Sequence, residues 1–144
     1  MLEQLFLGSI VTLVSLSGGS MMWWGLNEMF LRMESWLRRP PHPAKLVCVI
    51  LLVVVAIMGI VTFGVWLWAI VFHVLGVFST MEEAVYYSLV AYTTLGFGDD
   101  LMPTSERLLG GMTGANGFLM FGLMTAMITD TLRHTRRIQH NLRD

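Results

Sequence analysis

The chain has 144 residues, of which 55% are hydrophobic and only 13% are charged, and its mean hydropathy is +0.66. Because a soluble domain carries about 25% charged residues, this composition excludes an ordinary water-soluble globule and indicates a small integral membrane protein surrounded by lipid. The net charge of −1 argues against a nucleic-acid partner. The single cysteine, Cys48, excludes an intrachain disulfide, and no common catalytic motif predicts an enzyme or a cofactor.

The first predicted membrane helix lies within residues 1–33, which hold an uncharged stretch from Leu5 to Leu26. Several small residues interrupt this stretch, among them Ser15, Gly18 and Gly19. A signal peptide would begin with a basic region, which is missing here. We therefore expect a spanning helix, with an interfacial or re-entrant segment anchored by its tryptophans as the alternative.

A connector over residues 34–45 follows, and its Pro40-Pro41-His42-Pro43 cluster interrupts any helix. Basic residues gather around this connector and in the C-terminal region, which ends in a short tail over 134–144: Arg32, Arg38, Arg39, Lys45, Arg133, Arg136, Arg137 and Arg143. By the positive-inside rule both segments are cytoplasmic. The N-terminus and the segment from Gly76 to Arg107 are then expected outside.

The clearest span runs from Leu46 to Phe72 without a charge. As a helix it would be about 40 Å long, more than the roughly 30 Å of a hydrocarbon core. A last span is predicted from Leu108 to Ile128, and Gly110 and Gly114 within it form a small-xxx-small pair that allows close helix contact.

The outer segment between these two spans begins with a capping-box pattern, Thr80 and Glu83, which predicts a short helix to about Tyr92. Such a helix is too short to cross a bilayer but long enough to enter it halfway. The sequence TTLGFGD follows, from Thr93 to Asp99.

TTLGFGD resembles the selectivity-filter signature of potassium channels, and the inner-helix segment starting at Gly117 also resembles that family. The resemblance covers residues 46–133 and implies an all-α pore domain of helix, pore helix, filter and helix. It also implies a homotetramer in a bacterial inner (plasma) membrane, with membrane lipid and permeant potassium ions as its other partners. The N-terminal helix resembles that of small bacterial three-span channel-like proteins, and we expect it to be peripheral to the pore.

The resemblance also implies the roles of single residues. The filter would comprise Thr94, Leu95, Gly96, Phe97 and Gly98. Potassium would bind the carbonyls of its first four residues, 94–97, with the Thr94 hydroxyl completing the innermost site. Glycine at 96 and 98 suits a backbone that must alternate with positive φ. The filter would be supported by Thr93, Asp99, Tyr87 and Val90, where Val90 stands in place of a carboxylate that many family members carry.

Gly117, Phe121 and Thr125 recur along one stripe of the last span, and by resemblance this stripe lines the cavity and forms the gate. Gly117 is either a gating hinge or a site of close packing. Two other functions remain open: a weakly selective cation channel, suggested by Leu95 and the missing rear carboxylate, and a non-conducting subunit that modulates other channels.

Overall fold

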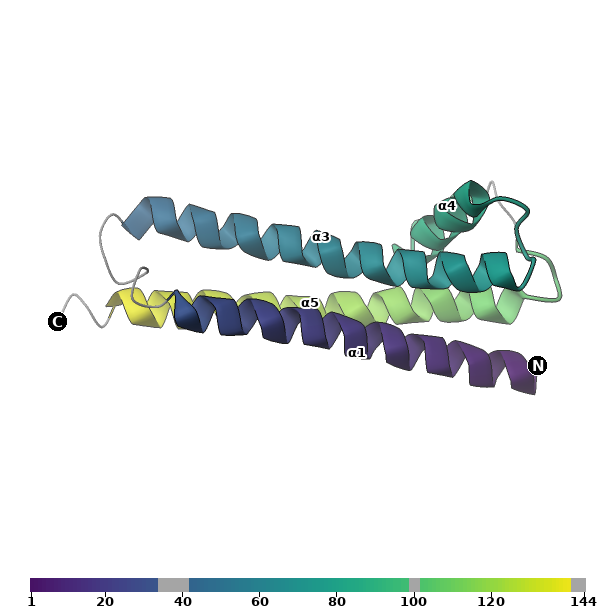
Figure 1. Cartoon of the computed structure of the whole chain (residues 1–144), viewed down its shortest axis with the longest axis horizontal. Coiled ribbons are helices and arrows are strands. Elements are labelled where there is room, and N and C mark those ends of the chain that lie inside the picture. Colours follow the sequence, from purple (N-terminus) through teal and green to yellow (C-terminus); the bar gives the residue numbers. More distant parts are fainter. Residues whose placement is uncertain (34–41, 99–101, 141–144) are drawn as a thin grey trace.

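Four helices form the part of the chain that the structure, a computed structural model, describes, namely residues 1–33, 42–98 and 102–140. They are α1 (Leu2–Arg32), α3 (His42–Val74), α4 (Met81–Tyr92) and α5 (Arg107–His140) (Figure 1). Most of the predicted connector and the Asp99 carboxylate lie outside the described residues. Helices α1, α3 and α5 each contain a stretch long and apolar enough to cross a membrane, which confirms three predicted spans.

The first span is one continuous helix of 31 residues that runs through Gly18 and Gly19 without interruption. Backbone groups in lipid have no water to bond, so a helix there tolerates glycines that would weaken it in water. This geometry favours the spanning interpretation over a re-entrant segment. The last helix, α5, extends to His140 and so continues beyond the predicted end at Ile128 into the basic tail.

The three long helices lie side by side, and α4 sits at one end of them against α3 and α5 (Figure 1). Helices α1 and α5 run in the same direction and α3 runs in the opposite one. The N-terminus is therefore at the same end as α4, and the C-terminus is at the other end. This is the relative arrangement that the charge pattern predicts.

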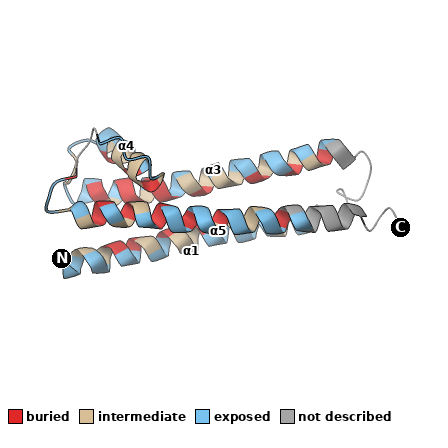
Figure 2. Ribbon diagram, turned by 180° about the vertical axis from the view of Figure 1, so that it is seen from behind, coloured by how far each residue is buried: buried red, intermediate tan, exposed pale blue. Residues whose placement is uncertain are grey.

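The helices bury one face each and leave the other face apolar and exposed (Figure 2). Trp68 and Phe72 of α3, Tyr92 of α4 and Met120 of α5 belong to the buried cluster at the centre. Large apolar side chains on the outside, such as Phe118 with 73% of its surface exposed, would be unfavourable in water. Contact with lipid suits these side chains.

Small residues of α1 bring it close to its neighbours. A Cβ atom at Gly8 would lie 2.4 Å from the sulfur of Met112 in α5, and one at Gly18 would lie 2.4 Å from the ring of Phe63 in α3. A Cβ atom at Gly19 would lie 2.6 Å from the terminal methyl carbon of Met120 in α5. These contacts set the position of α1 along both α3 and α5.

Candidate functional site

Helix α4 begins with the capping box that the sequence predicts. The Glu83 amide donates to the Thr80 hydroxyl, and the Thr80 amide donates to the Glu83 carboxylate, both at 3.2 Å. The Ser79 hydroxyl donates to the same carboxylate at 2.8 Å. The hydrogen bond from Ser79, followed by that from the Thr80 amide, lowers the pKa of Glu83 below its ordinary value, so its charge remains at the positive end of the helix dipole.

The C-terminal end of α4 closes with a Schellman-type turn. The Leu95 amide donates to the Val90 carbonyl and the Thr94 amide to the Ala91 carbonyl, each at 3.0 Å. Thr94 occupies the left-handed position of this turn, with φ of 59°. Glycine usually takes that position, since a β-carbon there costs about 1–2 kcal/mol. The turn ends α4 and reverses the direction of the chain.

The loop after α4 has an alternating backbone. Thr94, Gly96 and Gly98 have positive φ values of 59°, 57° and 77°, whereas Leu95 and Phe97 between them do not. A Cβ atom at Gly96 or Gly98 would meet no other atom within 4 Å. The glycines are therefore required by backbone conformation and not by lack of space.

A cavity of about 320 Å³ lies between this loop and α4. Tyr87, Val90, Gly96 and Gly98 contribute to its wall. The structure thus brings two of the predicted support residues close to the loop. Thr93, a third, is held at the helix end, where its hydroxyl donates to the Leu89 carbonyl at 2.7 Å. Asp99, the fourth, lies outside the described residues.

One face of α5 forms the seat of α4. The Tyr87 hydroxyl fits over Gly110, whose Cβ would lie 2.3 Å from it. One turn further along, Gly114 is close to the Ala91 carbonyl, and at Gly117 a Cβ would lie only 1.7 Å from the Tyr92 carbonyl oxygen. The small residues that the sequence marks for helix contact therefore receive the short helix and the start of the loop.

Tyr92, the last residue of α4, touches all three long helices and is fully buried. Its ring fits against Gly64 of α3, where a Cβ would lie 2.4 Å from the hydroxyl. Its hydroxyl is 3.5 Å from that of Ser15 in α1, and its ring centroid is 6.5 Å from that of Phe121 in α5. The sequence alone did not identify Tyr92 or Ser15 as site residues. The only signals were that Tyr92 directly precedes TTLGFGD and that Ser15 lies in a run of small residues.

The remaining two predicted gate residues lie on α5 beyond the seat of α4. Phe121 is 37% exposed beside Tyr92, and the Thr125 hydroxyl donates to the Phe121 carbonyl at 2.9 Å. Thr125 also lines a hollow of about 500 Å³ with Thr129 and Asp130. Phe121 and Thr125 are therefore accessible in the single chain, whereas Gly117, the first residue of the predicted stripe, is buried against α4.

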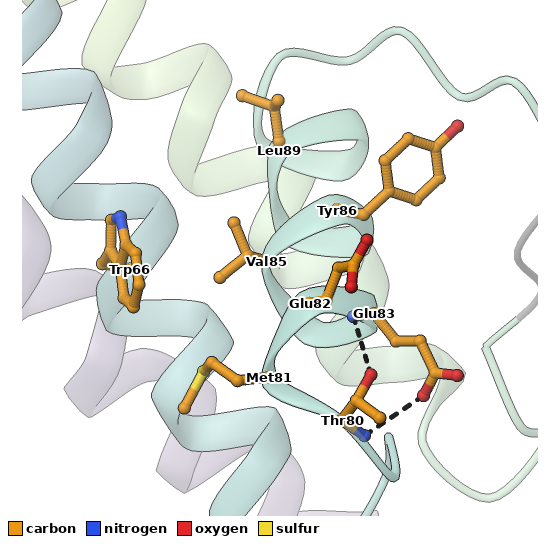
Figure 3. Close-up of a pocket in the computed structure, with 8 residues that line it drawn as sticks. All are labelled: Trp66, Thr80, Met81, Glu82, Glu83, Val85, Tyr86 and Leu89. Atoms are coloured by element: carbon orange, nitrogen blue, oxygen red, sulfur yellow. Dashed lines mark hydrogen bonds between the residues drawn. The ribbon is translucent and has the colours of Figure 1, made fainter.

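A larger hollow of about 840 Å³ opens between α3 and α4, and we refer to it as the α3–α4 groove. Trp66 of α3 faces Met81, Val85 and Leu89 of α4 across it, with Tyr86 and the capping box at its rim (Figure 3). Trp66 and Leu89 are 47% and 44% exposed. The groove is a largely apolar surface directly beside the helix that carries the loop.

No group of three or more histidine, cysteine, aspartate or glutamate side chains is placed to hold a metal ion among the residues the structure describes.

Fold and site define a class of protein: an integral membrane protein of three candidate spans, the last two of which enclose a half-length helix and a glycine-containing loop. A family model described as an ion channel matches residues 46–134, more than half of the chain. The chain therefore belongs to this ion channel family and is not an enzyme. The match covers most of α3, all of α4, the loop and most of α5, and α1 lies before it. No curated protein and no solved structure matches the chain.

Proposed function

We propose that four copies of this chain form a potassium-selective channel, in which residues 94–98 of each copy contribute one quarter of the filter. The observation that carries this proposal is the alternating sign of φ at Thr94, Gly96 and Gly98 directly after a half-length helix. Alternation of this kind lets successive carbonyls point to one side of a strand. Rings of such carbonyls replace the water around a potassium ion.

The position of α4 supports the same proposal. Its N-terminal end is at the outer end of the bundle, and its C-terminal end points into the bundle. The partial negative charge at that end favours a cation in the membrane interior. The Schellman-type turn uses the Val90 and Ala91 carbonyls, so the filter is attached to the helix end by hydrogen bonds as well as by the chain.

Assembly into a homotetramer follows from the geometry of conduction, since a single loop cannot surround an ion. The α3–α4 groove supplies a surface for it: an apolar hollow next to the filter-bearing helix, on the outside of the single chain. We infer that a neighbouring copy occupies this groove. By the positive-inside rule the N-terminus and the filter face outward and the C-terminus is cytoplasmic, as expected for a bacterial plasma membrane.

Flux through the purified protein in liposomes tests the proposal. The wild-type protein should carry potassium. In mixed potassium and sodium its reversal potential should lie close to the equilibrium potential of potassium. A reversal potential that follows both cations would support the weakly selective channel instead. Absence of flux from a correctly inserted tetramer would support the non-conducting subunit.

Gly96→Ala is the matching variant, because a methyl group at φ of 57° is strained in each of four copies. We expect it to abolish potassium flux while the tetramer still forms, since no atom lies within 4 Å of the added Cβ. Gly122→Ala on α5 is the control, as its Cβ also meets no neighbour and its backbone is helical. Unchanged selective flux in Gly96→Ala would contradict the filter assignment.

A further inference from the structure

Helix α1 precedes the region that matches the ion channel family, yet it contacts that region at two places, the residues just before α5 and the last residue of α4. Near its start, the Gln4 side-chain amide donates to the Ser105 carbonyl and, at 2.8 Å, to the Glu106 carboxylate. Further along, the Ser15 hydroxyl lies 3.5 Å from the Tyr92 hydroxyl. The expectation that this helix is peripheral to the pore stays a prediction, and the contacts show that α1 touches both the end of α4 and the residues just before α5.

The two contacts lie on one face of α1. Ser15 follows Gln4 by eleven positions, close to three full turns and about 16 Å along the helix. Between and beyond them, Gly8, Val11 and Gly19 are buried on the same side. The close approach of Gly8 to Met112 and of Gly19 to Met120 prevents α1 from sliding along α5. Both polar contacts are thus held at a defined depth.

At the deeper contact, the position of Tyr92 determines where the filter starts. Tyr92 is two residues before Thr94, and its carbonyl oxygen rests on Gly117 of α5. Its ring is confined by Gly64 of α3. A buried tyrosine hydroxyl requires a hydrogen-bond partner, and the structure places that of Ser15, itself fully buried, beside it. Movement of the phenol would move the backbone at Thr93 and Thr94.

We propose that α1 is a rear support of the filter, and that Ser15 and Tyr92 are positioning residues for the innermost ion site at Thr94. Gln4 holds the C-terminal end of the segment between α4 and α5, at Glu106 directly before α5. The expected effect of Ser15 and Tyr92 on selectivity rests on the proposed channel function. The support of the loop by α1 does not depend on conduction.

The test uses the full-length tetramer in liposomes with Ser15→Ala, Tyr92→Phe and the double variant. Each single variant should lower the potassium-to-sodium permeability ratio by up to about fivefold, the change that one lost hydrogen bond supports. The double variant should lower it no further than the larger single effect, because both changes remove the same contact. Ser20→Ala is the control, since the Ser20 hydroxyl is exposed and donates to the Leu16 carbonyl of its own helix.

A second readout needs no conduction. The Thr94 and Leu95 amides are hydrogen bonded to the end of α4, and their hydrogen exchange should be faster in Ser15→Ala and Tyr92→Phe than in Ser20→Ala. If the wild-type protein proves non-conducting, faster exchange in Ser15→Ala and Tyr92→Phe would still uphold the support role, while the channel function would be rejected. Unchanged exchange together with an unchanged permeability ratio, or additive effects in the double variant, would overturn the inference.

Discussion

At Gly117 the structure leaves no room for a side chain, and this changes what the residue is expected to do. A Cβ would lie 1.7 Å from the Tyr92 carbonyl oxygen, which is backbone and cannot turn aside. The sequence left a gating hinge and close packing open as alternatives. The contact supports close packing, since Gly117 is the place where α5 meets the last residue of α4. The hinge remains a prediction about motion.

Gly117→Ala should therefore displace α4. We expect a lower thermal midpoint of the tetramer and a loss of most potassium flux, because the filter moves with Tyr92. Gly122→Ala on the same helix should keep its flux and gain up to about 1 kcal/mol from the better helix propensity of alanine. Unfolding monitored by circular dichroism in detergent, beside flux in liposomes, compares the two.

A normal thermal midpoint in Gly117→Ala, combined with a reduced open probability and unaltered selectivity, would contradict close packing and favour the hinge.

At the scale of the element, α4 shows which local features the sequence could predict. Its start at Thr80, its capping box and its end at Tyr92 are as expected, because caps and short helices depend on neighbours a few residues away. The positive φ at Gly96 and Gly98 is also as expected. For Gly110, Gly114 and Gly117 the sequence indicated close contact but did not identify α4 as the helix in contact. Small residues indicate that something approaches closely, but they do not say which element approaches.

The contacts of Tyr92 were beyond prediction for the same reason. Ser15 lies 77 positions before it, and no periodicity connects a residue of one span to the end of a short helix in another. The extension of α5 to His140 was missed because the apolar stretch ends earlier than the helix does.

The capping box makes α4 sensitive to acid. The pKa of Glu83 is lower in the folded protein than its ordinary value, so the carboxylate contributes stability above the unfolded pKa and loses it as the pH falls through the folded one. Thr80→Ala should weaken α4 by about 1 kcal/mol at neutral pH. Hydrogen exchange of the α4 amides between neutral and acidic pH measures both effects.

Glu83→Gln should flatten this pH dependence, whereas the neighbouring Glu82→Gln should keep it. A pH profile in Glu83→Gln that equals the wild-type profile would show that another group is responsible.

At the scale of the whole molecule, the prediction concerns assembly. If a neighbouring copy occupies the α3–α4 groove, Leu89→Trp fills part of its space and should lower the tetramer fraction several-fold. Leu51→Trp is the control, because Leu51 is 60% exposed on the same helix as Trp66 but near the opposite end. The mass of the detergent-solubilised complex, compared with the 16.2 kDa chain, measures assembly. Equal tetramer fractions in both variants would place the subunit contact elsewhere.

The glycine contacts of α1, α3 and α5 also determine how this molecule can diverge over generations. A leucine that faces lipid can be exchanged for another apolar residue, because the hydrocarbon accepts either. Gly8, Gly64 and Gly117 cannot gain even a methyl group unless a neighbour moves, and at Gly117 that neighbour is main chain. Descendants of this sequence should therefore replace many of their large apolar residues while they retain the positions that carry no side chain at all.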